Sequence, residues 1–309
     1  MPAPHYIATI GTFDGLHTGH RALLQLLRRE GQSRGLLTMA VTFDRHPLSV
    51  VAPQAMPPQL SSDADRVGAL RRCGDVDNVM VLTFDDSTRA MTARQFMQRL
   101  HASGVRALLM GYDHCFGSDR PHGLDKYAAI GHDVGIEVVP SNLTVSIDGH
   151  AVSSSAIRQA LSQADIATAT AMLGHPYTIT ATVVHGRGDG HRLGFPTANM
   201  DVPPTLCLPA NGVYAATATW QGHTAPAMLN IGTCPTLTDG KRRTVEACII
   251  DPPVTPQLYG RQLTVQLTGH LRDERRFDSL QQLVAQLGDD RRQVLAMQTK
   301  HKCRPIKHN

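Results

Sequence analysis

The sequence predicts two domains of different class: an α/β domain on a parallel sheet, followed by an antiparallel β domain closed by one helix. The chain has 309 residues, and at roughly 100–200 residues per domain this length suits two domains. The first half alternates apolar runs with helical patterns, which favours parallel strands joined by crossover helices. From Tyr177 onward, short β-prone runs are separated by Gly, Pro and Asp-Gly, which favours an antiparallel sheet or a small barrel.

In the first domain, apolar runs and helically spaced leucines define the elements. Residues 6–10 form an apolar run that ends at Gly11, and a helical apolar pattern follows at Leu23, Leu24, Leu26 and Leu27. We expect further strands at 36–43, 79–83, 107–110 and 136–139, and helices near 63–72, 92–101 and 124–132. Ligands of such sheets bind beyond the C-terminal ends of the strands. The segments after Ile10, Phe43 and Met110 are therefore the places to look for a site.

The second domain begins after a boundary that we place near Gly174. Its expected strands are 177–185, 213–220, 225–231, 244–250 and 263–267, and its expected helix is 279–297. The remaining residues, 301–309, are basic, and we expect them to be loose.

Composition excludes several classes of protein. Hydrophobic residues make up 41% and charged residues 18%, which argues against a largely disordered chain. No run approaches the roughly 20 apolar residues of a membrane span, and no secretory signal is visible at the start. The six cysteines are scattered without a CxxC, so we expect a reducing, cytoplasmic compartment rather than disulfides or structural zinc. A net charge of +4 suits an anionic ligand, and the basic tail alone is a weak argument for binding nucleic acid.

The first chemical motif is Gly-Thr-Phe-Asp-Gly-Leu-His-Thr-Gly-His at residues 11–20, between the first strand and the first helix. Its glycines permit a tight turn and close approach of a ligand, and a helix N-terminus attracts an anion. His17 and His20 are three residues apart, so they can share one face and donate hydrogen bonds to phosphate oxygens. Capping and packing histidines, or a metal-binding pair, are the alternatives for such a pair.

A second motif is the serine run that precedes Arg158, at residues 153–158. Serine is a good helix N-cap, and this is the simplest interpretation of the run. Its functional interpretation is a set of hydroxyls and a guanidinium that hold the outer phosphates of a nucleotide.

Two further motifs lie in the second domain. Residues 185–199 form a glycine-rich string that ends in Gly-Phe-Pro-Thr-Ala-Asn. It matches neither a Walker A motif nor GxGxxG, so a plain turn between strands is the alternative to a phosphate-binding loop. Glu246 lies on an expected strand. A carboxylate at such a position more often belongs to the solvent-exposed face of a sheet than to a functional site.

Together these strings resemble the bacterial bifunctional riboflavin kinase/FAD synthetase family over nearly the full length. His-Thr-Gly-His at 17–20 resembles the nucleotidyltransferase HxGH, and residues 43–47 resemble Phe-Asp-Pro-His-Pro. Residues 111–117 resemble a flavin-binding loop, and 153–158 resemble Ser-Ser-Thr-x-x-Arg. Residues 194–199 match the riboflavin kinase signature, and residues 230–236 resemble Asn-Ile-Gly-x-x-Pro-Thr.

The resemblance implies a nucleotidyltransferase-like, Rossmann-type domain over 1–174 that adenylylates FMN to FAD and releases pyrophosphate. His17, His20 and Arg158 would then hold the phosphates of ATP and act in catalysis. The nucleotide-binding residues implied are Gly11, Phe13, Asp14, Gly15, Ser154 and Ser155. Those implied near the flavin are Asp113, Phe116 and His46. Because the FMN phosphate is already an anion, positioning and charge neutralisation suffice for this transfer.

For residues 175–309 the resemblance implies a riboflavin kinase barrel that uses ATP and Mg²⁺. Thr197 and Asn199 would bind Mg²⁺, for which oxygen ligands are suited. Gly186, Gly190, Gly194 and Pro196 would contact the nucleotide. Glu246 would take the proton from the riboflavin 5′-hydroxyl, since this nucleophile is a neutral alcohol that benefits from a base.

The chain departs from the family pattern at several positions of the first domain. Arg45 stands in place of Pro, His114 in place of an aromatic residue, Ala156 in place of a frequent Arg and Ser155 in place of Thr. These departures raise the hypothesis of a riboflavin kinase with a weakened or altered adenylyltransferase. A flavin-binding regulator without turnover is a competing hypothesis, and a nucleic-acid-binding protein ranks last.

Overall fold

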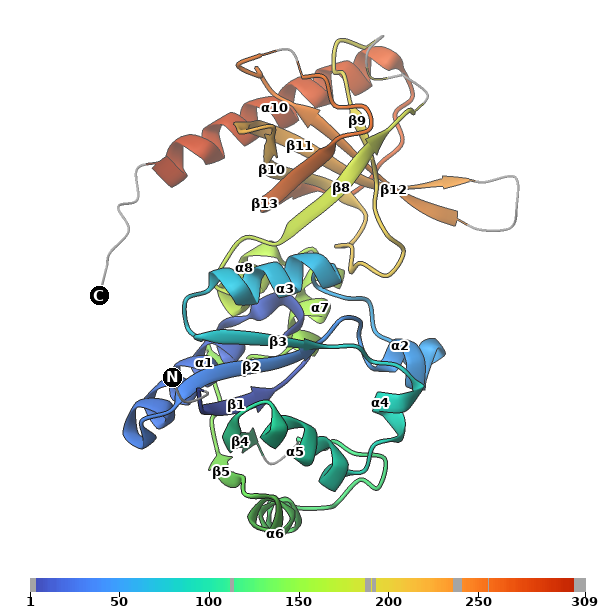
Figure 1. The fold of residues 1–309 in the computed structure, drawn as a ribbon. Coiled ribbons are helices and arrows are strands. Elements are labelled where there is room, and N and C mark those ends of the chain that lie inside the picture. Colours follow the sequence, from blue (N-terminus) through green and yellow to red (C-terminus); the bar gives the residue numbers. More distant parts are fainter. Residues whose placement is uncertain are drawn as a thin grey trace. The chain divides into compact units, whose positions relative to one another are not determined.

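The computed structural model describes residues 4–111, 114–186, 190, 193–235, 241–254 and 256–302. The chain forms two compact units, Met1–Ser154 and Ser155–Asn309 (Figure 1). The first is a parallel α/β fold and the second holds a closed antiparallel barrel with a helix. This confirms the fold class expected from the sequence.

Five parallel strands form the sheet of the first unit, in the order β3-β2-β1-β4-β5. The strands are β1 (Tyr6–Ile10), β2 (Leu37–Phe43), β3 (Asn78–Leu82), β4 (Val105–Gly111) and β5 (Glu137–Ser141). The chain builds outward from β1 through β2 and β3, then returns to the other side of β1 with β4. Such a reversal opens a crevice at the C-terminal ends of the central strands, where ligands of this architecture bind.

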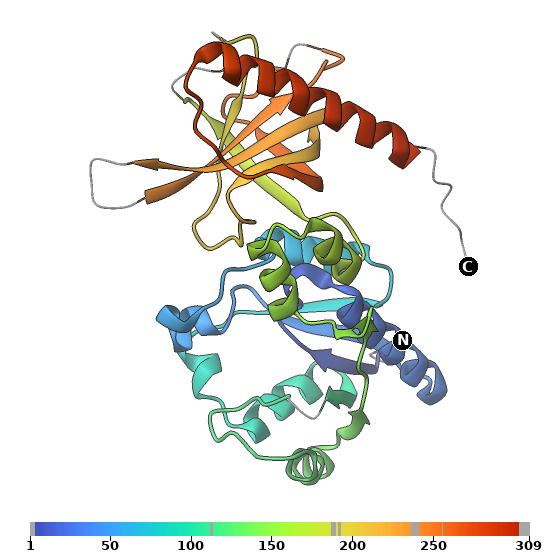
Figure 2. The ribbon, with the colours of Figure 1, turned by 180° about the vertical axis from the view of Figure 1, so that it is seen from behind.

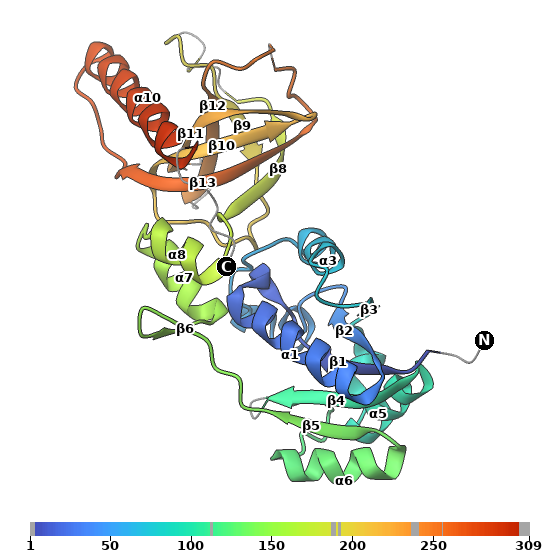
Figure 3. The same ribbon diagram turned by 90° about the vertical axis from the view of Figure 1, so that its left-hand side faces the viewer.

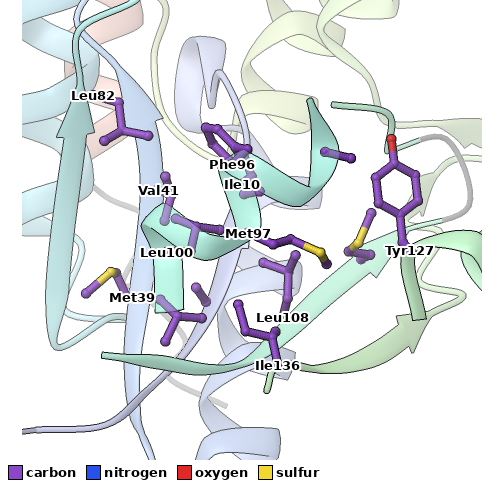
Figure 4. Close-up of a cluster of buried hydrophobic side chains, with 14 of the residues drawn as sticks. Ile10, Met39, Val41, Leu82, Phe96, Met97, Leu100, Leu108, Tyr127 and Ile136 are labelled. Atoms are coloured by element: carbon purple, nitrogen blue, oxygen red, sulfur yellow. The ribbon is translucent and has the colours of Figure 1, made fainter. Parts of the chain in front are cut away.

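Helices cover both faces of this sheet. They are η1 (Asp14–Leu16), α1 (Thr18–Arg34), α2 (Leu48–Val51), η2 (Pro53–Ala55), α3 (Asp63–Arg72), α4 (Asp86–Ala90), α5 (Ala93–Ala102) and α6 (Leu124–Val134). Ile7 of β1 packs with Leu24 and Leu27 of α1. Its neighbour Ala8 belongs to a second cluster around Phe96, whose larger side chains are shown in Figure 4. This division follows from the alternation of side chains along a strand. Figure 3 shows α1 and α6 on opposite sides of the sheet.

Local sequence signals set several helix ends. Ser62 Oγ accepts a hydrogen bond from Asp65 N at 3.1 Å at the start of α3. Thr92 and Gln95 form a reciprocal capping box at the start of α5. Gly35 ends α1 with a left-handed φ of 65°, a conformation that glycine adopts without strain.

A short hairpin that the sequence did not predict follows β5 near the end of this unit. It pairs β6 (Ser146–Ile147) with β7 (His150–Ala151).

The second unit starts with α7 (Ser154–Ser162), whose first residue belongs to the first unit, and α8 (Ile166–Leu173). Its barrel closes in the order β10-β11-β12-β9-β8-β13. The strands are β8 (Thr178–Val184), β9 (Ala198–Asp201), β10 (Gly212–Trp220), β11 (His223–Pro235), β12 (Lys241–Ile249) and β13 (Gln262–Arg272). β9 was not expected from the sequence, because it has only four residues, two of them polar, and follows a glycine-rich string.

Small and branched residues fill the barrel. The pairs Ala216–Ala227 and Ala218–Ala225 join β10 to β11, and all four side chains are buried. The opposite side of the same strands lies under α10 (Leu280–Lys302), where Val294 packs on Met228 (Figure 2). The helix extends beyond the expected end at residue 297, and residues 301 and 302 belong to it rather than to a loose tail. No helix in the described ranges has the length and hydropathy needed to cross a membrane.

A buried ion pair fixes α10 to the barrel. Asp290 is fully buried, and Arg272 at the end of β13 donates to it with Nη2 at 2.8 Å and Nε at 3.0 Å. Gln286 Nε2 donates to the same carboxylate at 2.7 Å. A buried carboxylate is tolerated only when such partners satisfy it, so Arg272 is needed to keep the helix in place.

We therefore expect Arg272→Met to lower the free energy of unfolding of the barrel by about 3–5 kcal/mol, because it leaves a buried charge without its cation. Trp220, the single tryptophan, is buried in β10, so its fluorescence in urea reports on this unit. Arg291→Met is the control, because its ion pair with Asp251 is exposed and is worth less than about 1 kcal/mol. Equal losses in the two variants would contradict the role given to Asp290.

Candidate active sites

The loop after β1 holds residues 13–16 in a buried turn of unusual backbone conformation. Phe13, Gly15 and Leu16 have positive φ values of 52°, 76° and 38°, and residues 13–16 are all buried. A non-glycine residue in this region costs of order 1–3 kcal/mol and persists only where its surroundings hold it. The Phe13 ring lies against Gly11, where an added Cβ would come within 3.2 Å of it. A bulkier residue at position 11 would displace the ring.

The carboxylate of Asp14 holds this turn from inside. It accepts hydrogen bonds from Leu60 N at 2.8 Å and Ser61 N at 3.2 Å, while Gly15 N donates to Ser61 Oγ at 3.2 Å. On the other side, Ser154 Oγ donates to the Asp14 carbonyl at 3.3 Å. The carboxylate of Asp14 thus faces a neighbouring backbone segment, and the assignment of Asp14 to nucleotide binding stays a prediction.

His17 and His20 lie side by side at the start of α1. His17 is the N-cap, and its Nδ1 accepts a hydrogen bond from His20 N at 3.3 Å. The proton of a neutral His17 therefore lies on Nε2. The two rings stack with centroids 3.6 Å apart and planes 15° apart. An added Cβ on Gly19 would come within 3.1 Å of His17 Nδ1, so a small residue between the histidines keeps the stack close.

His20 is held in its neutral form. Burial lowers the pKa of this imidazole well below its usual value, and the nearby His17 and His114 lower it further. Its Nδ1 is buried and has no hydrogen-bond partner within the described part of the chain. A bound anion would supply both a partner and a counter-charge, which favours the protonated imidazole. The pair therefore has the chemistry of an anion-binding site.

The segment after β2 lies beside the next loop. Asp44 Oδ1 accepts from Phe84 N at 3.0 Å, and Arg45 is exposed with its Nε 3.7 Å from Asp44. His46 Nδ1 accepts from Leu48 N at 3.2 Å at the start of α2. This bond orients the imidazole of His46, whose place near the flavin stays a prediction.

The loop after β4 is only partly described, because Tyr112 and Asp113 lie outside the described residues. Phe116 is half-buried and packs on Phe96 and Tyr127, with ring centroids 5.2 and 4.7 Å away. Tyr127 Oη donates to Phe116 O at 2.7 Å and accepts from Phe116 N at 2.8 Å. These contacts anchor the loop to the core of the first unit.

The serine run starts a helix, as its simplest interpretation predicts. Ser154 is the first residue of α7, and its hydroxyl binds the carbonyl of Asp14. Ser155 is exposed, and Arg158 lies one turn further along the helix and is half-buried. The phosphate-binding roles of Ser155 and Arg158 stay predictions.

In the barrel, two glycines of the string at 185–199 lie close to the two expected metal ligands. An added Cβ on Gly186 would come within 2.0 Å of Asn199 Nδ2, and one on Gly190 within 2.9 Å of Thr197 Oγ1. The Gly190 carbonyl accepts from Phe195 N at 2.9 Å. Residues 187–189, 191 and 192 of the string lie outside the described residues. Glycine is therefore required at 186 and 190, because any side chain would displace Asn199 or Thr197.

Strand register places three polar side chains in one row. Glu246 of β12 is directly opposite Asn199 of β9 on one side and Asn230 of β11 on the other. Side chains at such positions have Cβ atoms roughly 4.5–5.5 Å apart. All three residues are half-buried. Two asparagines thus flank Glu246 on the neighbouring strands, and Gly186 lies close to the Asn199 amide.

A cavity of about 120 Å³ lies beside Thr197. Its other walls are mostly apolar and include Pro196, Ala247, Leu258 and Tyr259. The Tyr259 ring is exposed and stacks on His185 with centroids 4.0 Å apart and planes 17° apart. Gly194 has a φ of 79°, with open space where a Cβ would be. The cavity combines apolar walls with a few polar groups, as small-molecule sites do.

Both units match sequence models of known families. The FAD synthetase model matches residues 2–156, and the riboflavin kinase model matches residues 173–298. The bifunctional riboflavin kinase/FMN adenylyltransferase of Escherichia coli K12 is 38% identical over 94% of this chain and 91% of that protein. The chain belongs to this bifunctional family. The Pseudomonas fluorescens member is 35% identical over 92% of this chain and 90% of its own length.

The fold of this chain is similar to that of a solved structure. A Streptococcus pneumoniae protein, titled a macrolide-efflux protein, has a TM-score of 0.80 and 29% identity. The alignment covers 94% of each of the two chains.

The structure also shows polar contacts beside the row that sequence reasoning did not assign to a site. Glu274 Oε1 lies over Gly232, where an added Cβ would come within 2.6 Å of it. Asn211 Nδ2 donates to Glu274 Oε2 at 3.2 Å, and Arg243 Nε donates to Asn211 Oδ1 at 3.0 Å. Glu274 follows β13 in a run of charged residues, 272–276. Such a run is usually a solvent-exposed surface, so it did not indicate a site.

The neutral state of His20 predicts a pH dependence of stability. Because its pKa is lower in the folded chain than the unperturbed 6.5, the unfolded chain takes up the proton first as the pH falls. The free energy of unfolding should decrease below about pH 6.5, by up to about 1.4 kcal/mol per pH unit, until folded His20 is protonated too. His20→Asn should remove this component, as measured by urea unfolding followed by circular dichroism between pH 7.5 and 5. Identical slopes for the wild type and His20→Asn would contradict a buried, neutral His20.

Proposed function

We propose that this chain converts riboflavin to FMN in the barrel and FMN to FAD in the α/β unit, using one ATP for each step. The observation that supports the proposal is that each unit holds a cluster of polar side chains of a different kind, the stacked histidine pair in one and the row around Glu246 in the other. The barrel has a carboxylate residue, Glu246, paired with an asparagine on each neighbouring strand, which suits activation of an alcohol. The α/β unit has a stacked imidazole pair at a helix N-terminus, which suits binding of an anion.

In the kinase step, Glu246 is the proposed base. The riboflavin 5′-hydroxyl is neutral, so a carboxylate within reach accelerates its attack by accepting the proton. The 5′-oxygen forms a bond to the γ-phosphorus of ATP, the bond from that phosphorus to the β-γ bridging oxygen breaks, and ADP leaves. Asn230 and Asn199, opposite Glu246 in the register, would orient this carboxylate.

We propose that Thr197 and Asn199 hold Mg²⁺ in this step. A hydroxyl and an amide provide the oxygen ligands that this ion prefers, and two glycines of one string, Gly190 and Gly186, lie close to these two side chains. The ion would neutralise charge on the ATP phosphates. Backbone groups of Gly186, Gly190 and Gly194 would contact the phosphates. Pro196, in the wall of the cavity beside Thr197, would contact the nucleoside.

In the adenylyl step, His17 and His20 are proposed to hold the triphosphate, together with Arg158. An oxygen of the FMN phosphate attacks the α-phosphorus of ATP, and the bond to the α-β bridging oxygen breaks, so pyrophosphate leaves. Gly11, Phe13, Gly15, Ser154 and Ser155 would shape the nucleotide site. Asp113, Phe116 and His46 would lie near the flavin. We also propose that the adenylyltransferase domain spans residues 1–174 and the riboflavin kinase domain residues 175–309. We further propose that the enzyme is located in the cytoplasm, where ATP is available.

The test follows flavins over time by chromatography after the enzyme is mixed with riboflavin, ATP and Mg²⁺. The wild type should form FMN first and FAD later. Glu246→Gln should slow FMN formation by roughly 10²- to 10⁴-fold, because the base is lost. It should still convert added FMN to FAD at the wild-type rate.

The matched variant is the double substitution His17→Ala/His20→Ala, which should form FMN normally and stall there. Together the two variants separate the sites within one polypeptide. A wild type that stops at FMN would support a riboflavin kinase with an altered adenylyltransferase. No turnover of any flavin would contradict the proposal and favour a flavin-binding protein.

A further inference from the structure

Arg66 of α3 is buried and linked to the ends of two strands. Only 3% of it is exposed. Its Nη1 donates to the Thr12 carbonyl at 3.1 Å and to Thr42 Oγ1 at 2.7 Å. Its Nη2 donates to the Phe43 carbonyl at 2.8 Å and to Asp63 Oδ1 at 2.9 Å. The guanidinium therefore connects the loop after β1 with the loop after β2.

Both of these loops lead into proposed site residues. Thr12 directly precedes the strained turn at 13–16 and the histidine pair, and Phe43 opens the segment that contains His46. The guanidinium is planar and presents its donors in a fixed fork. Its bonds therefore set the spacing of the two loops as well as holding each of them.

The chain just before Arg66 supports the same turn. Leu60 N and Ser61 N bind the Asp14 carboxylate, and Asp63 is the anionic partner of Arg66. We call Leu60, Ser61, Asp63 and Arg66 the 60–66 brace. A strained backbone keeps its conformation only if its surroundings over-determine it. The brace supplies that support through both the Asp14 side chain and the Thr12 carbonyl.

We propose that Arg66 is a positioning residue for adenylyl transfer, acting through the backbone of Thr12 and Phe43 to hold the histidine-bearing loop in its reactive geometry. This inference rests on the proposed function of the first unit. A burial of this degree keeps the guanidinium from forming part of the substrate contact surface. Its effect is therefore on where His17 and His20 lie.

The experiment compares steady-state adenylyl transfer from added FMN in Arg66→Lys and Thr42→Val with the wild type. Lysine at position 66 keeps the charge but loses the planar set of donors. Valine at position 42 removes the hydroxyl that accepts from Arg66 Nη1, at nearly constant side-chain volume. A displacement of about 1 Å at such a site can cost roughly 100-fold in rate. We expect kcat to fall roughly 10- to 100-fold in Arg66→Lys and several-fold in Thr42→Val, with a smaller change in the KM for FMN.

Three controls separate positioning from loss of folding. First, activity is measured under conditions in which circular dichroism shows that each variant is fully folded. A residue with a merely structural role would lower the fraction of folded enzyme but would leave kcat per folded molecule unchanged. Riboflavin kinase activity of each variant should equal that of the wild type. Arg71→Met, on the exposed last turn of α3, should leave both activities unchanged.

Wild-type kcat per folded molecule in both Arg66→Lys and Thr42→Val would overturn the inference. Failure of the proposed function is a different result: the wild type itself would then form no FAD from FMN.

Discussion

Strand register is the constraint on which the barrel site depends. The backbone hydrogen bonds of β12 to β9 and β11 fix which residues face one another, and they place Glu246 between Asn199 and Asn230. A slip of one residue would turn Glu246 to the other side of the strand and bring a buried alanine or valine into the row. The residues that set this register are the apolar ones inside the barrel and under α10, so the core also positions the chemistry.

In the first unit, strand order sets the location of the site and buried polar groups set its shape. Parallel strands bring the ends of β1 and β2 to one edge of the sheet. The turn at that edge is strained, and the Asp14 carboxylate and the Arg66 guanidinium, both nearly fully buried, hold it. Burying charges is unfavourable unless they are fully hydrogen-bonded. Strained backbone and buried charges tend to occur at functional sites, and the proposed nucleotide site is at this turn.

The sequence predicted the order and type of most elements because periodicity records which face of a strand or helix is buried. β1 has the bounds expected from its apolar run, and the alternating pattern of the first half predicted the parallel sheet. β9 was missed because four residues are too few to show a clear strand pattern, although partners pair with it on both sides. The motif residues were chosen by resemblance, and their catalytic roles stay predictions. The contacts of Asp14 with Leu60 and of Arg66 with Thr12 were not predictable, since these partners lie 46 and 54 residues away in the chain.

The two units are proposed to transfer different parts of ATP, the γ-phosphoryl group in the barrel and the adenylyl group in the α/β unit. Radioactive phosphorus at the γ or the α position of ATP distinguishes these two transfers. The most direct test follows radioactive label from [γ-³²P]ATP and [α-³²P]ATP into flavins made from riboflavin by the wild type. We expect that γ label enters FMN and is retained in FAD, whereas α label enters FAD alone. Label from the α position in FMN, or FAD without α label, would contradict the assignment of a kinase and an adenylyltransferase to this chain.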